Sequence, residues 1–298
     1  WLSGEAGTNL SRDWDIPHVT TFHTLGRVKM EARPAEKESS DRLKTESHVV
    51  KQADSVIVST MQEKLDLERL YGLPFSKVAV VPAGVDLDLF KPIGRSRAKR
   101  ELGLVDDHVL LSVGRIEPIK GLDILISALA QTENIANTKL VIVGGEQTET
   151  AEKKRLETLA LRLGLQKTIR FVSAVNQLEL PTYYNAADVF VMPSFYESFG
   201  LAALESMACG TPVIASRVAG PKSFIDDGKT GVLVSWQSPK AYAERIDQLL
   251  NDLGLRMRIA ASASQKAQSM GWNMVADKIL EHYNHIVGQQ WTKVVGED

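Results

Sequence analysis

Short runs of Val, Ile and Leu alternate with helical patterns along most of this chain. The runs contain few polar positions, which is typical of strands buried on both faces of a parallel sheet. We predict strands at residues 18–23, 54–59, 77–81, 108–113, 139–143, 168–172, 188–192, 212–215 and 231–234. Helices are predicted between them, among others at 42–53, 62–72, 122–130 and 151–164. The pattern predicts an α/β fold with parallel sheets covered by helices.

A connector interrupts this alternation. Residues 82–96 carry two prolines and two glycines, a composition typical of a loop. The six strands predicted after it suffice for a complete doubly wound sheet, whereas the three before it would leave a sheet edge exposed. We therefore expect an incomplete first domain, completed by a segment ahead of Trp1 or by another chain. The expected domains are a partial N-terminal domain at 1–85, a connector at 86–107, a C-terminal domain at 108–271 and a final helix within 272–298.

Composition narrows the range of functions. The 298 residues are 44% hydrophobic and 24% charged, as in a globular protein with real cores. A net charge of -2 gives no reason to expect nucleic acid or an anionic membrane as a partner. The single cysteine, Cys209, cannot form an internal disulfide, and we expect it to be a small buried residue. With no signal peptide and no apolar run near the roughly 20 residues of a membrane span, we predict a cytoplasmic location.

Two cations follow the strand predicted at 108–113. Arg115 and Lys120 lie on one strand-to-helix loop, and Gly121 opens the next helix. Ligands of open α/β sheets bind at the carboxyl ends of the strands. Such a pair suits a diphosphate, because Arg binds it in bidentate fashion and Lys adds a point charge. The alternative is that both are solvated loop charges.

Two glutamates, Glu197 and Glu205, follow the strand predicted at 188–192. Gly200 lies between them at the start of a predicted helix, where unpaired N–H groups make an anion site. Glu205 then suits the paired hydroxyls of a ribose, and Glu197 the group beyond the phosphates. This arrangement predicts a site for a nucleotide-diphosphate sugar. The alternative is that Glu197 is a loop residue and Glu205 a residue of the helix surface.

Other motifs are weaker or absent. Gly144 and Gly145 follow another strand and permit close backbone approach, although glycine in such a place is usually only a turn. The sequence contains neither G-x-G-x-x-G nor the P-loop motif, which argues against dinucleotide oxidoreductases and P-loop NTPases. No His, Cys, Asp or Glu cluster has metal-site spacing, so we expect no metal site.

Taken in order, these stretches resemble the family 4 retaining glycosyltransferases of GT-B fold. The matching segments are VGRIEPIKG, ESFGLAALES, ACGTPVIAS, GVDLDLF and DDGKTGVLV, and the resemblance covers essentially the whole chain. It implies two Rossmann-like domains facing across a cleft, the first one incomplete, with a final helix that crosses back onto the first domain. In the family, a strand and a Gly-rich loop lie roughly a hundred residues ahead of the position that matches Trp1.

The resemblance implies a metal-independent hexosyltransferase without a cofactor of its own. It would move a hexose from a UDP-, GDP- or ADP-hexose to an acceptor hydroxyl, with retention of configuration and no protein nucleophile. The residues expected to act in catalysis are His23, Arg115, Lys120 and Glu197. The residues expected to bind the donor are Gly114, Arg115, Lys120, Gly144, Phe171, Glu197, Ser198, Phe199, Gly200, Leu201 and Glu205.

The N-terminal half also matches, through TFHTLGRVK and DRLKTESHVVKQADSVIVST. These two segments are most similar in sequence to the branch of the family that acts on small phosphorylated acceptors, such as sucrose-phosphate synthases and inositol-phosphate glycosyltransferases. The expected acceptor-binding residues are His23, Thr24, Lys29 and Arg42, with Thr24 and Arg42 holding the acceptor phosphate. The alternatives are a core histidine at position 23 and a solvated helix charge at position 42.

Two other functions stay open on the sequence alone. The first is a truncated, catalytically incompetent fragment that binds a nucleotide sugar without transferring it. The second is a nucleotide-sugar epimerase of the same fold, which would need a base at the sugar's C2 and no acceptor site. The pairing of HTLGRVK with RLKTE argues against the epimerase.

Overall fold

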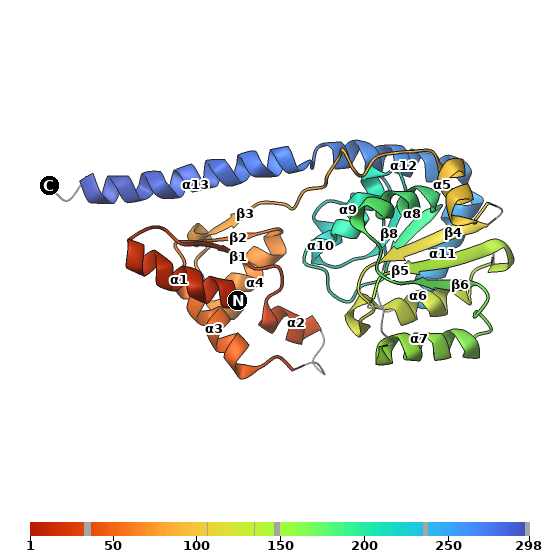
Figure 1. Cartoon of the computed structure of the whole chain (residues 1–298), viewed down its shortest axis with the longest axis horizontal. Coiled ribbons are helices and arrows are strands. Elements are labelled where there is room, and N and C mark those ends of the chain that lie inside the picture. Colours follow the sequence, from red (N-terminus) through yellow and green to blue (C-terminus); the bar gives the residue numbers. More distant parts are fainter. Residues whose placement is uncertain (33–36, 106, 134, 146–149, 235–237, 296–298) are drawn as a thin grey trace. The chain divides into compact units, whose positions relative to one another are not determined.

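The computed structural model describes residues 1–298 except 33–36, 106, 134, 146–149, 235–237 and 296–298. The chain forms two compact units. The N-terminal unit contains residues 1–84 together with 272–298, and the C-terminal unit contains residues 85–271. Each unit is built on its own parallel sheet, as the apolar runs predicted (Figure 1).

The N-terminal unit has a three-stranded sheet of order β1-β2-β3. Its strands are β1 (Val19–Thr21), β2 (Ser55–Val58) and β3 (Val78–Val80). Its helices are α1 (Leu2–Trp14), α2 (Gly26–Ala32), α3 (Ser40–Gln52), α4 (Met61–Tyr71), the 3-10 turn η1 (Phe75–Lys77) and α13 (Trp272–Val295). The helix over residues 2–14 is not among the elements that the pattern predicted, and α13 lies within the range 272–298 expected for the final helix.

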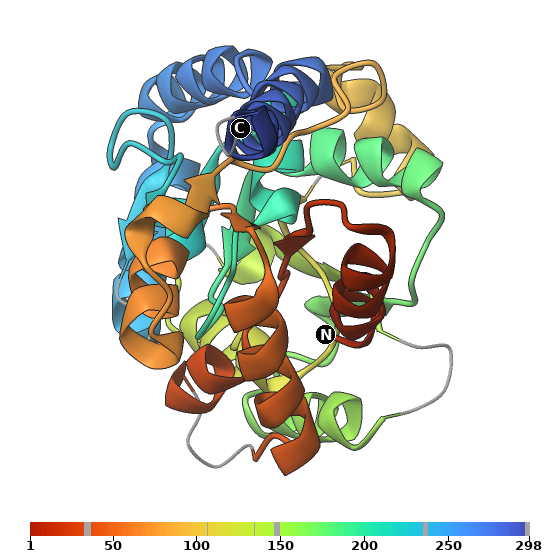
Figure 2. The same ribbon diagram turned by 90° about the vertical axis from the view of Figure 1, so that its left-hand side faces the viewer.

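Helices cover both faces of this small sheet. Val275 and Ile279 of α13 pack against Ile57 of β2, and the His282 ring lies 2.8 Å from the Ser55 hydroxyl on the same face. Helices α3 and α4 lie on the opposite face, and α1 lies beside α3 (Figures 1 and 2). The helix ends carry local signals, because the Ser39 side chain caps α3 and a Thr60–Glu63 capping box starts α4.

The C-terminal unit has a six-stranded parallel sheet of order β6-β5-β4-β7-β8-β9. Its strands are β4 (His108–Val113), β5 (Thr138–Val143), β6 (Ile169–Val172), β7 (Val189–Met192), β8 (Val213–Ser216) and β9 (Val232–Val234). Its α-helices are α5 (Arg95–Leu102), α6 (Leu122–Leu129), α7 (Ala151–Arg162), α8 (Leu180–Ala186), α9 (Leu201–Ala208), α10 (Ala219–Lys222), α11 (Pro239–Asn251) and α12 (Leu253–Gln268). Short 3-10 turns are η2 (Pro118–Lys120), η3 (Ile135–Asn137) and η4 (Gln177–Glu179).

The core of this unit lies on both faces of the sheet. Helices α8, α9 and α12 lie on one side and α6 and α7 on the other (Figure 1). The central strands are largely buried, for example Val189 to Met192 of β7, which explains their unbroken apolar runs. The strand order reverses between β4 and β7, which is the topological switch point where ligands of such sheets bind.

Two further observations limit the range of functions. Within the part of the chain that the structure describes, no helix is long and apolar enough to cross a membrane. Among those same residues, no cluster of three or more His, Cys, Asp or Glu side chains is placed to hold a metal ion. Cys209 is buried at the end of α9, and burial raises the pKa of its thiol to about 12, so the prediction of a small buried residue is confirmed.

Candidate active site

The loops that follow β4 and β7 meet at the switch point of the C-terminal sheet. The Phe195 N–H donates a hydrogen bond to the Ile119 carbonyl at 2.8 Å, which joins the two loops. Gly121 permits this approach, because a Cβ atom there would lie 2.2 Å from the Pro193 carbonyl oxygen. Its φ of 64° also lies in the left-handed region that favours glycine. The loops carrying Lys120 and Glu197 are therefore held together by backbone contacts.

The predicted diphosphate and sugar residues converge only in part. The Lys120 ammonium group lies 2.8 Å from a Glu197 carboxylate oxygen, and both side chains are mostly buried. Arg115 lies on the same loop as Lys120 but pairs with Glu117 at 2.6 Å, and its side chain is 74% exposed. The structure thus brings together Lys120 and Glu197, which are 77 positions apart in sequence. Arg115 stays on the solvent-exposed side of the loop.

Helix α9 begins at Gly200, whose φ is 103°. Among the described residues, the backbone N–H groups of Phe199, Gly200 and Leu201 have no hydrogen-bond partner, as expected at a helix start. Leu201 is exposed, while Phe199 is buried against Phe224 with 5.0 Å between ring centroids. Ser198, half-buried, lies in the same loop. Unpaired N–H groups at a helix start can bind an anion, and these lie between the two glutamates in sequence.

Glu205 lies one turn further along α9 and is half-buried. One of its oxygens accepts a hydrogen bond of 2.6 Å from the hydroxyl of Tyr184, a fully buried residue of α8. Burial raises the pKa of Glu205, and the Tyr184 hydrogen bond partly opposes that shift. Glu205 is therefore a positioned carboxylate, and its interpretation as an ordinary residue of the helix surface is wrong.

A pocket of about 520 Å³ opens at the carboxyl ends of β4, β5 and β6. It is lined by residues of the loops after β4, β5 and β6 and by the start of α8: Val113, Gly114, Arg115, Ile116, Glu117, Val143, Gly144, Gly145, Thr150, Ala174, Val175 and Leu180. Gly144 is required here, because a Cβ atom would lie 2.0 Å from the Gly114 carbonyl oxygen. Phe171, by contrast, packs against the core of the sheet and does not line the pocket.

Two supporting residues escaped the sequence analysis. Tyr184 orients Glu205, and Gly220 supports the loop that carries Glu197. The Gly220 N–H donates to the Glu197 carbonyl at 3.1 Å, and a Cβ atom at Gly220 would lie 2.4 Å from the Phe199 carbonyl oxygen. Neither residue belongs to a recognisable motif, so only the tertiary structure identifies them.

The predicted acceptor residues of the N-terminal unit gather around Arg42. Its guanidinium donates hydrogen bonds to Glu46 at 2.7 Å, to Glu38 at 3.0 Å and to the Thr24 carbonyl at 2.9 Å. The Lys29 ammonium group joins them through Glu38 at 2.9 Å. Arg42 is therefore not a solvated helix charge. His23 is exposed in the loop after β1, so its interpretation as a core histidine is also wrong.

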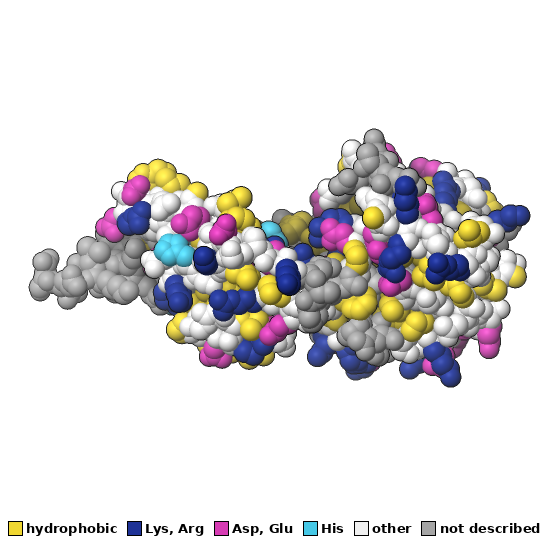
Figure 3. All heavy atoms as spheres, turned by 90° about the horizontal axis from the view of Figure 1, so that it is seen from below, with side chains coloured by type: hydrophobic (Ala, Val, Ile, Leu, Met, Phe, Trp, Pro, Cys, Tyr) yellow, Lys and Arg dark blue, Asp and Glu magenta, His cyan; other side chains and the backbone are white. Residues whose placement is uncertain are grey.

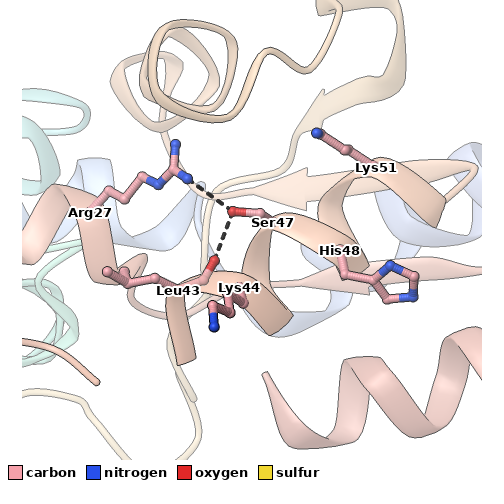
Figure 4. A pocket seen from close by; sticks show the side chains of 6 residues that line it. All are labelled: Arg27, Leu43, Lys44, Ser47, His48 and Lys51. Atoms are coloured by element: carbon pink, nitrogen blue, oxygen red, sulfur yellow. Dashed lines mark hydrogen bonds between the residues drawn. The ribbon is translucent and has the colours of Figure 1, made fainter. Parts of the chain in front are cut away.

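A second hollow, which we call the basic groove, lies on α2 and α3 of the same unit. It measures about 420 Å³ and is lined by Arg27, Leu43, Lys44, Ser47, His48 and Lys51 (Figure 4). Arg27 donates a hydrogen bond to the Ser47 hydroxyl, and Ser47 in turn donates to the Leu43 carbonyl. The space-filling view shows Lys and Arg side chains gathered around a histidine on this unit (Figure 3). None of the predicted site residues lines the basic groove.

Two known families match the two halves of the chain. Residues 94–266 match the family described as "Glycosyl transferases group 1", and residues 1–89 match "Glycosyltransferase Family 4". A protein from Xylanimonas cellulosilytica named D-inositol 3-phosphate glycosyltransferase is 39% identical over 292 residues. That alignment covers 95% of this chain and 70% of the relative.

Solved structures agree with this assignment. A sucrose-phosphate synthase from Thermosynechococcus elongatus is 33% identical and superposes with a TM-score of 0.88, covering 97% of this chain and 72% of that one. The Anabaena protein HepE, solved in complex with UDP-glucose, is 25% identical with a TM-score of 0.84. That superposition covers 95% of this chain and 76% of HepE.

Proposed function

Because this chain belongs to the family 4, group 1 glycosyltransferases, we propose that it transfers a hexose from a nucleotide-diphosphate sugar to a hydroxyl of a small phosphorylated cyclitol or sugar. The observation that carries the proposal is the convergence of Lys120, Glu197 and the start of α9 at the switch point of the C-terminal sheet. Inositol 3-phosphate is the first acceptor to test, since the similar relatives are named for it.

In this proposal the donor lies along the carboxyl edge of the C-terminal sheet. The nucleoside base enters the 520 Å³ pocket, where Ile116 and Val175 offer apolar surface. Glu205 accepts hydrogen bonds from the ribose hydroxyls, and the N–H groups at the start of α9 bind the diphosphate. When the donor phosphate pairs with Lys120, the ion pair between Lys120 and Glu197 breaks. The Glu197 carboxylate can then accept hydrogen bonds from the sugar hydroxyls. For His23, the family resemblance alone supports a role in binding the transferred sugar.

Stabilising the departing diphosphate is the main electrostatic task of such a transfer. Lys120 and the dipole of α9 supply positive potential at that point, and Arg115 adds a further cation from the rim of the pocket. We assign no protein nucleophile and propose retention of the anomeric configuration. These groups supply the positive charge without a metal ion in the proposal, so we expect turnover to be insensitive to EDTA.

The test is a transfer assay with UDP-, GDP- and ADP-hexoses against inositol 3-phosphate, a hexose 6-phosphate and unphosphorylated inositol. We expect one nucleotide sugar to donate, phosphorylated acceptors to be preferred, and proton NMR of the first product to show the anomeric configuration of the donor. Lys120→Ala should lower kcat by roughly 10²-fold, the scale of removing one group that stabilises developing negative charge.

Lys139→Ala is the matched control, because Lys139 lies half-buried near the amino end of β5, away from the carboxyl edge of the sheet. Among the described residues its ammonium group donates only to the Lys167 carbonyl. A product with inverted anomeric configuration would contradict the proposed retention. Equal turnover of phosphorylated and unphosphorylated acceptors would contradict the proposed acceptor class. Donor binding without transfer or hydrolysis would favour a nucleotide-sugar-binding protein that lacks catalytic activity.

A further inference from the structure

The segment that leads into α3 places a carboxylate between two cations of the expected acceptor site. One Glu38 oxygen lies 2.9 Å from the Lys29 ammonium group, and the other lies 3.0 Å from a terminal nitrogen of Arg42. The Glu38 side chain is only 13% exposed. The hydrogen bond from Lys29, followed by the charge of Arg42, lowers the pKa of Glu38, so its carboxylate is ionised at neutral pH.

The arginine in this cluster is held independently of Glu38. Its Nε atom donates to Glu46, a fully buried residue, and another nitrogen donates to the Thr24 carbonyl. Glu46 is itself fixed, because its second oxygen accepts hydrogen bonds from the Gly26 N–H at 2.9 Å and the Tyr71 hydroxyl at 2.8 Å. Glu38 has no such anchoring, since it belongs to no helix or strand and precedes the Ser39 cap of α3.

We propose that Glu38 is a displaceable internal counter-anion, which occupies the acceptor-phosphate site in the free enzyme and sets the charge that an acceptor must carry. The proposal rests on the function proposed above and adds a specificity-determining residue to it. The Glu38 carboxylate bridges Lys29 and Arg42 with two oxygens, as two oxygens of a phosphate would.

The charges around the site explain the selection. The three side chains Lys29, Arg42 and Glu46 together carry a formal charge of about +1. If a neutral group replaces the Glu38 carboxylate, the favourable electrostatic interaction with the two cations is lost. If a singly charged anion replaces it, that interaction energy is unchanged. A phosphate monoester approaches a charge of −2 at neutral pH, so it alone gains from the exchange. Glu38 thus keeps weakly charged anions and unphosphorylated acceptors off the site.

The experiment is calorimetric titration of inorganic phosphate into the full chain and four variants: Glu38→Gln, Lys29→Met, Glu31→Gln and, for the basic groove, Lys44→Ala. We expect Glu38→Gln to bind phosphate about tenfold more tightly, the scale of one hydrogen-bonded charge competitor. Lys29→Met should lose most of the binding. Glu31→Gln is the matched control, because Glu31 is likewise paired with an arginine, Arg69 at 2.6 Å, but takes no part in the cluster. Its phosphate affinity should equal that of the wild type.

Steady-state kinetics give a second readout on the same variants. Glu38→Gln should lower KM for the phosphorylated acceptor by about the same tenfold, with KM for the nucleotide sugar unchanged. A residue that merely orders Arg42 would have the opposite effect, because its removal would raise the acceptor KM.

The outcomes separate the inference from the function on which it rests. Unchanged or weaker phosphate binding by Glu38→Gln, with loss of binding in Lys29→Met, overturns the role of Glu38 and leaves the acceptor site standing. Retained binding in Lys29→Met with loss in Lys44→Ala places the anion in the basic groove instead, which overturns both. Absence of phosphate binding in every variant, Glu38→Gln included, also overturns both.

Discussion

Burial raises the pKa of the Glu205 carboxyl group, while the hydrogen bond from Tyr184 lowers it. A ribose needs the ionised form, because only a carboxylate accepts hydrogen bonds from both hydroxyls. Nucleoside-diphosphate affinity should therefore fall as the pH drops through the raised pKa, which lies above the ordinary 4.5. Glu205→Gln should remove this dependence together with roughly 1.5–3 kcal/mol of binding free energy. Tyr184→Phe should move the midpoint to higher pH. Calorimetry with UDP across the pH range measures all three effects.

The phosphate of UDP also titrates near pH 6, but it does so alike in every variant. The difference between wild type and Glu205→Gln therefore isolates the carboxylate, and parallel curves would remove Glu205 from the ribose site. The sign for stability is opposite to that for binding. Because the folded-state pKa is raised, the fold binds an extra proton between pH 4.5 and that pKa, and stability falls as pH rises through this window. At neutral pH, Glu205→Gln should be at least as stable as the wild type.

At the scale of elements, the donor site depends on how closely the loops after β4 and β7 approach each other. Gly121→Ala would combine a left-handed backbone with a Cβ atom 2.2 Å from the Pro193 carbonyl oxygen. We expect a loss of unfolding free energy beyond the roughly 1–2 kcal/mol of backbone strain alone, together with weaker UDP binding. Denaturant unfolding and calorimetry measure the two effects.

Gly164→Ala is the matched control for that variant. Gly164 has a φ of 72° in the same unit, yet a Cβ atom there meets nothing within 4 Å. Gly164→Ala should lower the free energy of unfolding only by the backbone strain and should leave the UDP affinity unchanged. Equal stability losses in the two variants would mean that the loops separate without difficulty and that their contact does not hold the site.

At the scale of the whole molecule, the expected donor residues all belong to the C-terminal unit, residues 85–271. This unit is continuous in sequence and has a six-stranded sheet with its own core. Expressed alone, residues 85–271 should unfold cooperatively and bind UDP within about threefold of the full chain, a difference of about 0.6 kcal/mol. The fragment should transfer no sugar, because His23 and Arg42 are absent from it.

Thermal unfolding and UDP titration of the fragment test this expectation. If the fragment aggregates, hydrogen exchange on the full chain replaces these measurements. Bound UDP should slow the exchange of amide hydrogens in residues 114–121 and 195–205 of the full chain. Protection by UDP confined to the N-terminal unit would contradict the assignment of the donor site.

The sequence by itself determined the element types and the order of the strands along the chain. The strands that the structure describes were all predicted to within one or two residues. Burial on both faces leaves unbroken apolar runs in strands such as β7. Helix α1 was missed, because only Thr8 among its residues is buried and its sequence contains two glycines, which are poor helix formers. The motifs on the loops after β4 and β7 were also visible, since strand ends are where such sheets bind ligands.

Only the tertiary structure decided which of those side chains meet. Lys120 and Glu197 lie 77 positions apart and come together because β4 and β7 are neighbours in the sheet, a pairing that no local pattern encodes. Tyr184 beneath Glu205, and Glu38 between Lys29 and Arg42, have no motif of their own. Local propensity acts over a few residues, whereas the position of a charge depends on strand order and packing, and these are properties of the folded chain.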